Sequence, residues 1–246
     1  MKLTRSALAL TVGALAPALL LATPALAAGP SAAGPSAAAP AKVAAVTAGE
    51  SPYDTMSDAE LRAEVTRILA ANPGRGVTGA AHEALAGTTE DVRTFLKTGL
   101  AKAQDDDNKV AILRILFGKP GKGVTREANR ALDGTPADRV AFLATGLAKA
   151  QDEDNKVAIL RILFGKPGKG VTREANRALD GTPADRVAFL ATGLRLAQAE
   201  DDRVAVATIL ARPGISAALY AECQRVLNDG TPEVLRHFIT VGQFQF

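Results

Sequence analysis

Apolar and polar positions recur along this chain with a helical period, and the whole pattern then recurs at a fixed interval. The dipeptide Ile-Leu returns every 47 residues, at Ile68, Ile115, Ile162 and Ile209. A phenylalanine followed by an aliphatic residue returns at the same interval and, the last time, after 49 residues, at Phe95, Phe142, Phe189 and Phe238. Residues 98–144 and 145–191 differ only at Asp106 against Glu153. A fixed period of this length predicts a repeat protein with about four copies.

Each copy is predicted to contain three helices, and the third copy shows the first of them most clearly. Over residues 170–180 the apolar positions fall at i, i+4, i+7 and i+8, namely Val171, Ala175, Ala178 and Leu179. This spacing gives one apolar helix face. Gly181 follows the helix, where we expect a residue with positive φ to end it.

A second helix is predicted to start directly after that glycine. In Thr182-Pro183-Ala184-Asp185, threonine is the expected N-cap, proline fills the first helical position and aspartate completes a capping box. The pattern recurs at residues 135–138 and at Thr88 with Asp91. We expect this helix to run to about Thr192 and to bury Val187, Leu190 and Leu194.

The third helix carries Val157, Leu160, Ile162 and Leu163 and is expected to end at Gly165. Its start has two interpretations. The acidic cluster 151–154 could break the chain and cap a new helix, or Gly146 could cap the second helix and the third could run unbroken from about Ala148. We favour the long helix, because residues 148–151 are good helix formers.

A single copy cannot bury both faces of its helices, so neighbouring copies must stack. The predicted fold is therefore all-α, an α-solenoid-like array of about four three-helix repeats of about 47 residues. A single globular bundle with internal pseudo-symmetry is the alternative. The repeat domain is expected over residues 57–246, with copies at about 57–103, 104–150, 151–197 and 198–246.

The N-terminal segment differs from the repeats. Lys2 and Arg5 precede an apolar run over residues 7–21, and Ala25-Leu26-Ala27 follows. This is typical of a secretory signal peptide over residues 1–27, and the run is shorter than the roughly 20 residues that a membrane helix needs. An uncleaved anchor is the alternative. Residues 28–56, rich in Ala, Pro, Gly and Ser, are predicted to be a disordered linker.

Cleavage after Ala27 would change the charge of the protein. The full chain has a net charge of +3, and loss of the two basic residues of the signal peptide would leave about +1. Both signs alternate along the helices, so we expect no nucleic-acid partner. Cys223 is the only cysteine, which excludes an intramolecular disulfide.

Two repeated motifs suggest chemistry, but each fits a structural role better. The turns with Lys119, Lys122, Lys166 and Lys169 resemble a phosphate loop, yet Val124 and Val171 follow the last glycine where a P-loop requires lysine. A weak anion site near the helix N-termini stays possible. The acidic clusters at 105–108 and 152–155 lack the glycine and the final glutamate of a calcium loop, so exposed helix surface or a cap is expected.

The remaining candidate groups are few. His82 stands at a polar position of the repeat and His237 lies far from it in the sequence, so a histidine metal site is not expected. Cys223 replaces Ala128 and Ala175, which predicts a buried packing residue and not a nucleophile. The C-terminal Phe244 and Phe246 either cover the end of the stack or form an exposed partner-binding tail. No catalytic, cofactor-binding or metal site is therefore predicted.

The recurring string REANRALDGTPADRVAFLATGLAKAQDEDNKVAILRIL resembles the ALF repeat, named for its alanine, leucine and phenylalanine positions. The matching residues are Ala84-Leu85 with Phe95, Ala131-Leu132 with Phe142, Ala178-Leu179 with Phe189, and Leu227 with Phe238, where Val226 replaces the alanine. The resemblance covers about Leu61 to Gly242. It implies an exported helical protein and no particular biochemical activity.

These observations lead to one expected function with two alternatives. We expect a secreted, extracellular, non-enzymatic repeat protein that binds or scaffolds an unknown protein or cell-envelope macromolecule, without a cofactor and without a stable membrane anchor after signal cleavage. The first alternative is a secreted hydrolase that uses the repeated surface carboxylates. The second is a structural or vestigial exported array related to the non-toxic part of secreted effectors.

Overall fold

The computed structural model describes residues 51–246. The predicted signal peptide at 1–27 and residues 28–50 of the predicted linker lie outside the described residues. The fold begins slightly before the predicted boundary at residue 57. The 3-10 turn η1 (Pro52–Asp54) has a capping box with Ser51, and the side chains of Tyr53 and Met56 pack against the first hydrophobic core. These two apolar side chains extend the folded part into the predicted linker.

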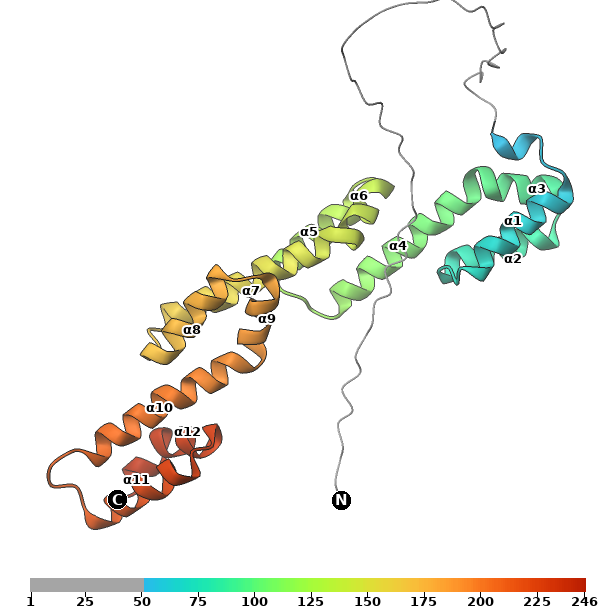
Figure 1. Cartoon of the computed structure of the whole chain (residues 1–246). Coiled ribbons are helices and arrows are strands. Elements are labelled where there is room, and N and C mark those ends of the chain that lie inside the picture. The colour runs from blue at the N-terminus through green and yellow to red at the C-terminus, as the bar shows by residue number, and fades with distance from the viewer. Residues whose placement is uncertain (1–50) are drawn as a thin grey trace, which may run out of the picture. The chain divides into compact units, whose positions relative to one another are not determined.

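The described chain is all-α and consists of four successive copies of one helical pattern (Figure 1). The first copy contains α1 (Asp58–Ala70), α2 (Arg75–Ala86), α3 (Thr89–Thr94), the π-helical turn η2 (Phe95–Gly99) and the long helix α4 (Leu100–Phe117). The second contains α5 (Lys122–Asp133), α6 (Pro136–Ala141), η3 (Phe142–Gly146) and α7 (Leu147–Phe164). The third contains α8 (Lys169–Asp180), α9 (Pro183–Ala188), η4 (Phe189–Gly193) and α10 (Leu194–Leu210). The fourth contains α11 (Ala217–Asp229), α12 (Pro232–Thr240) and the 3-10 turn η5 (Gly242–Phe244). The predicted all-α repeat array is confirmed.

The predicted capping box between the first two helices of a copy is also confirmed. The hydroxyl of Thr182 accepts a hydrogen bond from the Asp185 amide at 3.3 Å, and the Asp185 carboxylate accepts one from the Thr182 amide at 2.7 Å. Thr135 with Asp138 and Thr88 with Asp91 form the same box. These hydrogen bonds satisfy two amides that the first turn of a helix would otherwise leave unpaired.

Gly181 follows the first helix, as predicted, but the predicted positive φ is wrong. Gly181 has φ −84° and ψ −160°, which is an extended conformation open to any residue. A Cβ atom at this position would lie 2.7 Å from Oδ2 of Asp185, so the close approach of the capping-box carboxylate explains the glycine. Among the glycines that follow the first helix of each copy in the described chain, only Gly230 has positive φ (+65°), where it ends α11.

The second and third predicted helices are joined without a break. Gly146 has φ −63° and ψ −41°, which is ordinary right-handed helix, so it does not cap the second helix. A π-helical turn stands there instead: in the third copy the amide of Leu194 bonds the carbonyl of Phe189, five residues earlier. A Cβ at Gly193 would lie 3.3 Å from the ring of Phe189, so this glycine leaves room for the phenylalanine one turn before it. The long third helix that we favoured is confirmed as α7.

The additional residue in the π turn changes which side chains face the core. Val187, which was predicted to be buried, is 54% exposed. Val157 and Leu160 of the third helix are 43% and 53% exposed. The buried positions of the same helices are Arg186, Phe189 and Ile159. A regular period of 3.6 residues extended through the FLATG segment gives the wrong face, because a π turn shifts the phase of the helix by one residue.

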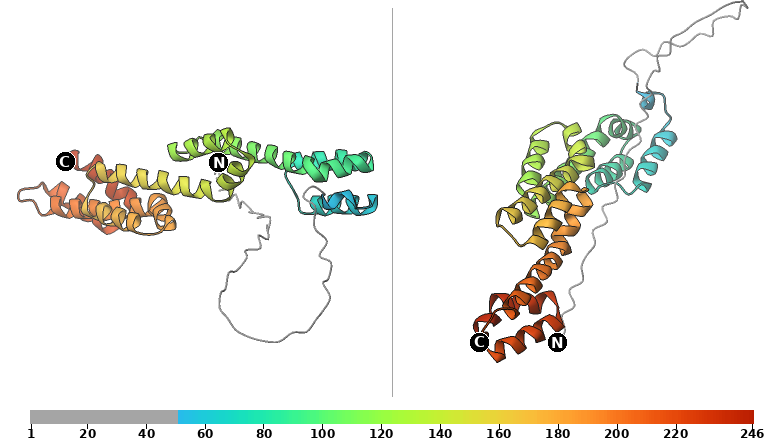
Figure 2. Two further views of the ribbon diagram at one scale, coloured as in Figure 1. Left: turned by 90° about the horizontal axis from the view of Figure 1, so that it is seen from above. Right: turned by 60° about the vertical axis from the view of Figure 1, so that its left-hand side comes forward.

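The described chain divides into two compact units, residues 51–113 with 139–144 and residues 114–138 with 145–246. In the first unit, α1, α2 and α3 pack together and bury Leu61, Val65, Val77, Ala81, Val92 and Phe95. In the second unit, α7 packs against α5, α8 and α9, and α10 packs against α8, α11 and α12 (Figure 2). Each long helix of this unit is therefore shared by two neighbouring copies, as stacking requires.

Candidate functional site

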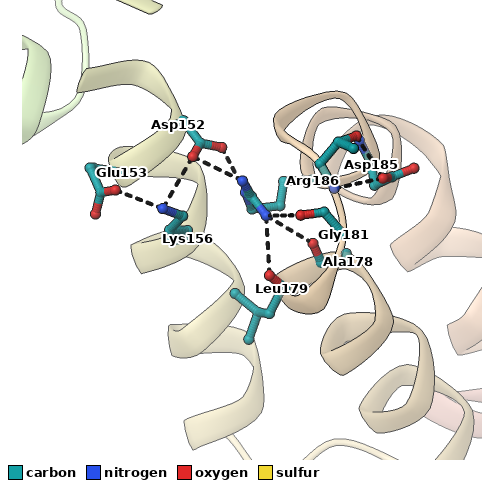
Figure 3. Close-up of polar contacts among 9 residues, drawn as sticks. Asp152, Glu153, Lys156, Ala178, Leu179, Gly181, Asp185 and Arg186 are labelled. Carbon is teal, nitrogen blue, oxygen red and sulfur yellow. Dashed lines mark hydrogen bonds and ion pairs between the residues drawn. The ribbon is translucent and has the colours of Figure 1, made fainter. Parts of the chain in front are cut away.

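The most developed polar site of the second unit is built around Arg186 on α9, which is only 5% exposed (Figure 3). Its Nε and Nη2 donate to the two carboxylate oxygens of Asp152 on α7, at 2.6 and 2.9 Å. Its Nη1 donates to the backbone carbonyls of Ala178, Leu179 and Gly181, at 3.3, 3.1 and 2.8 Å. The planar guanidinium thus joins three helices, because it binds a carboxylate bidentately and also satisfies the C-terminal carbonyls of α8.

The first unit contains the same ion pair one copy earlier. Nε and Nη2 of Arg139 donate to Asp105 at 2.6 and 2.9 Å, and both residues are buried. Hydrogen bonds from Arg139 and Lys109 lower the pKa of the Asp105 carboxyl to about 2. In the second unit, Arg186 likewise lowers the pKa of Asp152. Each pair is therefore fully ionised at neutral pH and holds its helices together by charge-assisted hydrogen bonds.

Sequence reasoning missed these buried pairs. It treated the acidic clusters as exposed surface or caps and did not consider Arg139 and Arg186, each of which directly follows a capping aspartate. The available signal was a repeated spacing: the aspartate and the arginine stand 34 residues apart in both copies.

A second aspartate of each cluster, on the long helix, caps the helix that follows the glycine turn of the same copy. The carboxylate of Asp154 on α7 accepts hydrogen bonds from the amides of Gly123 and Val124 at 2.7 and 3.0 Å. Asp107 on α4 and Asp201 on α10 bind the corresponding amides of α2 and α8. A Cβ at the N-cap residue Gly121 would lie 2.3 Å from Asp154 Oδ2, which explains the glycine. The clusters therefore do include a cap, but the capped helix is α5, which packs against the cluster, and not a new helix that starts at the cluster, because residues 151–154 lie inside α7.

This capping argues against the weak anion site that was considered near four lysines, namely Lys119, Lys122, Lys166 and Lys169. The amides that would bind an anion at the start of α5 and α8 already bind Asp154 and Asp201. Because an internal carboxylate occupies the site, the positive end of each helix is neutralised within the fold. The glycine and lysine turns are thus connections between helices, and Lys119 and Lys166 adopt φ of 50° and 51°.

The other predicted groups lie apart from one another. His82 and His237 are exposed, and among residues 51–246 no three or more His, Cys, Asp or Glu side chains form a group that could hold a metal ion. Cys223 is buried, as predicted, and burial raises the pKa of its thiol, which disfavours a nucleophilic thiolate. Phe244 is 76% and Phe246 53% exposed, so neither covers the end of the last copy.

The fourth copy replaces the buried ion pair by apolar side chains. Ala199 stands where Asp152 stands one copy earlier, and Leu235 takes the place of Arg186; both are buried in one cluster. A different pair follows beside them, in which Arg236 Nε lies 3.0 Å from Asp202 Oδ2. That oxygen is buried and accepts no hydrogen bond, because the arginine N–H is not directed at it. Burial raises the pKa of Asp202. A pocket of about 200 Å³ adjoins this pair.

The long helices also carry an exposed apolar surface, which we call the Val-Leu-Phe face. It consists of Val110, Leu113 and Phe117 on α4 and of Val157, Leu160 and Phe164 on α7. Both phenylalanines are 90% exposed, and both leucines are more than half exposed. The three residues stand at i, i+3 and i+7, so they lie along one side of each helix. Sequence reasoning assigned Val157 and Leu160 to the third helix without separating its exposed side from its buried side, and so missed this surface.

Comparison with known protein families identifies the repeat. The profile of the ALF family, described as short repeats of unknown function, matches residues 62–103, 109–150, 156–197 and 203–246. The chain belongs to the ALF repeat family. The four matches cover all four helical copies, so the resemblance seen in the sequence is confirmed. No curated protein matches the chain. Among the described residues, no helix of this ALF protein is both long and apolar enough to cross a membrane.

Proposed function

We propose that this ALF protein is an exported, non-enzymatic binding module that recognises another macromolecule through the Val-Leu-Phe face. The observation that carries the proposal is the exposure of Phe117 and Phe164, each 90% accessible at the C-terminal end of a long helix. Solvent-exposed aromatic residues in a row with aliphatic ones are typical of interaction surfaces.

The repetition of this face supports binding in preference to accidental exposure. The same Val, Leu and Phe appear on α4 and α7, 47 residues apart. Two identical binding faces on one chain can engage a partner that itself has repeated sites, and such divalent contact increases the apparent affinity. Export is proposed from the N-terminal pattern of residues 1–27, with the cell wall or the surrounding medium as the site of action.

The use of the carboxylates weighs against the hydrolase alternative. A pair of catalytic carboxyl groups needs open access to substrate and tuned pKa values. Asp105 and Asp152 are instead bound to buried arginines that lower their pKa, and Asp107, Asp154 and Asp201 cap helices.

The proposal is tested by affinity purification of the tagged chain after incubation with culture medium and cell-wall extract. The wild type is compared with a variant that carries Leu113→Ser, Phe117→Ser, Leu160→Ser and Phe164→Ser. A matched control carries Val140→Ser and Val187→Ser, which remove two exposed apolar side chains elsewhere. A macromolecule retained by the wild type and the control but lost by the fourfold variant is the expected result. If all three proteins retain the same material, or none, this face does not bind a partner and the structural or vestigial alternative is favoured.

A further inference from the structure

The fourth copy contains a pocket of about 200 Å³ between α10 and the N-terminal half of α12, and all of its lining residues belong to the second unit. Ala199 and Pro232 form its apolar part, and Gln198 and four charged side chains form the rest. This volume equals roughly seven water molecules at about 30 Å³ each. Pockets for drug-sized molecules are larger, at roughly 300 to 1,000 Å³. The pocket therefore has room for one small polar molecule.

The pocket lies where the fourth copy departs from the buried ion pair of the middle copies. Ala199 stands in place of Asp152, the aspartate that Arg186 binds one copy earlier. A methyl group occupies less space than a carboxylate side chain, and Leu235, which replaces the arginine, is buried on the other side of α12 in the hydrophobic cluster. The substitution to alanine thus leaves free space beside α10.

Asp202 is the unusual residue in the wall of this pocket. Its side chain is only 6% exposed, and neither carboxylate oxygen accepts a hydrogen bond from residues 51–246. A buried carboxylate without hydrogen bonds is costly for a fold. The equivalent residues of the middle copies are Asn108 and Asn155, so the packing of these helices does not require a charge at this position.

The guanidinium group beside Asp202 has donors that are not used within the fold. Arg236 Nε lies 3.0 Å from Asp202 Oδ2, and neither Nη1 nor Nη2 makes a hydrogen bond with the described part of the chain. A carboxylate that lacks donors and a guanidinium that lacks acceptors therefore stand side by side at the pocket. An α-amino acid carries an ammonium and a carboxylate group on one carbon atom, so it can satisfy both.

A second pair of opposite charges lies at the other end of the pocket. Arg195 donates a hydrogen bond to Glu233 there. Arg195 and Asp202 are seven residues apart on α10, which is about 10 Å along the helix. Both signs of charge are thus present at each end. A simple anion or a simple cation would meet a like charge wherever it bound, so the pocket favours a molecule that carries both signs.

The complete set of charges occurs only in the fourth copy of the described chain. The third copy has uncharged residues at all four equivalent positions, namely Ala148, Asn155, Ala184 and Val187, and the second copy has Ala101, Asn108, Ala137 and Val140. The first copy has Leu61 in place of Asp202. Four charges that line one pocket therefore appear together in one copy, which favours a binding site over independent changes of surface residues.

We propose that this pocket binds one small α-amino acid, whose carboxylate accepts hydrogen bonds from Arg236 and whose ammonium donates to Oδ1 of Asp202, the carboxylate oxygen that the protein does not enclose. Charge-assisted hydrogen bonds of this kind are strong. The ligand side chain lies over Ala199 and reaches Gln198 and the second ion pair, which favours a side chain with a polar end. This site is separate from the Val-Leu-Phe face and adds a second binding activity to the proposed function.

The first test is isothermal titration calorimetry of the full chain with each of the amino acids found in proteins, up to about 10 mM. At least one is expected to bind with a Kd of about 1 mM or lower. The corresponding amine, which lacks the carboxylate, and the corresponding carboxylic acid, which lacks the ammonium, should each bind at least about tenfold more weakly. Absence of binding by every amino acid, or equal binding of the amine or the acid alone, would overturn the proposal.

Two variants locate the site, and both take their new residue from the third copy, where the same fold accepts it. Asp202→Asn introduces the residue found at Asn155, and Arg236→Val introduces the residue found at Val187. Each should weaken binding at least about tenfold, and circular dichroism verifies that each is folded. Glu200→Gln changes an exposed charge of α10 outside the pocket and is the matched control, which should bind like the wild type. Unchanged binding by Asp202→Asn or Arg236→Val would exclude this pocket as the site.

The outcomes separate this inference from the proposed function. If a macromolecule is captured through the Val-Leu-Phe face while no amino acid binds, only the pocket proposal fails. If an amino acid binds in the pocket and no macromolecule is captured, only the proposed function fails.

Discussion

The acidic residues of one cluster bind different partners, and the partner of each carboxylate depends on its position in the cluster. In the cluster on α7, Asp152 binds the buried Arg186, Glu153 binds Lys156 at the surface, and Asp154 caps α5. Successive helix residues point about 100° apart, so three adjacent acids face three different directions. Capping and ion pairing are therefore achieved by neighbouring residues of the same helix.

A first prediction concerns the buried ion pair, for which the fourth copy supplies a template. Arg186→Leu alone should lower the thermal midpoint clearly, because it leaves Asp152 without its buried partner. Adding Asp152→Ala, which reproduces the Ala199 and Leu235 pair, should recover most of the loss. Recovery should be incomplete, since the carbonyls of Leu179 and Gly181 also lose a donor. Thermal unfolding of the wild type and the two variants measures this, and a double variant no more stable than Arg186→Leu would contradict the argument.

A second prediction concerns pH. The folded-state pKa of Asp105 is about 2, below its ordinary value of 3.8, so ionised Asp105 stabilises the fold above about pH 4. As pH falls from 4 towards 2 the carboxyl group becomes protonated and this contribution is lost. Urea midpoints at pH 7, 4 and 3 should therefore decrease for the wild type. Asp105→Asn should be less stable at pH 7 and should show a smaller decrease, and an unchanged pH dependence would assign the acid sensitivity to other carboxyl groups.

At the scale of elements, glycines mark two kinds of close approach. At Gly74, Gly121 and Gly168 the carboxylate of another helix occupies the space of a side chain, and at Gly99 and Gly193 a phenylalanine ring lies where a Cβ would crowd it. The first contact joins two helices and the second shapes the π turn within one. Both contacts depend on a neighbouring group and not on backbone conformation, since none of these glycines has positive φ.

A third prediction compares two glycines of α2. Gly74→Ala should destabilise the protein by about 1 to 2 kcal/mol, because its Cβ would lie 2.3 Å from the capping carboxylate of Asp107. Gly79 stands inside the same helix with no atom within 4 Å of a Cβ. Gly79→Ala should therefore stabilise the helix by about 1 kcal/mol. Chemical denaturation distinguishes the two, and equal effects of both substitutions would show that the Asp107 cap contributes nothing.

At the scale of the whole molecule, stability is distributed along the chain in copies. Separate hydrophobic clusters form around Phe95, Phe189 and Phe238, and the clusters around Phe189 and Phe238 contain helices of consecutive copies. The described outer copies differ from the middle ones: Ser57 and Ser216 cap α1 and α11 locally. Local caps suit helices that receive no carboxylate from another long helix.

A fourth prediction follows from this distribution. Phe238 is 2% exposed and packs with α10, α11 and α12, so Phe238→Ala should cost about 3 to 5 kcal/mol locally. Because repeat arrays couple mainly to their neighbours, hydrogen exchange should accelerate over residues 203–246 and stay unchanged in α1 and α2. Phe95→Ala is the matched control and should give the opposite distribution. Uniform acceleration along the chain after either substitution would indicate a single cooperative unit.

The four copies, the bounds of the first helix of a copy, the end of the long helix and the Thr-Pro-x-Asp caps could be predicted from the sequence alone. These features depend on interactions between residues close in the chain, such as Thr182 with Asp185, and on a repetition that is directly visible. The burial of Cys223 and the exposure of His82 followed from the same alignment of copies, because equivalent positions share an environment.

Only the tertiary structure decided which face of the long helices is buried and what the acidic clusters do. The π turn at FLATG shifts the helix phase between α9 and α10 and between α6 and α7, and packing places Arg186 inside while Val187, Val157 and Leu160 lie outside. Asp152 and Arg186 are 34 residues apart, and Gly121 meets Asp154 across two helices. Contacts between residues so far apart in the sequence depend on how the helices pack, and the local periodicity of the sequence carries no information about that packing. The exposed Val-Leu-Phe face, and with it the proposed binding surface, became visible for the same reason.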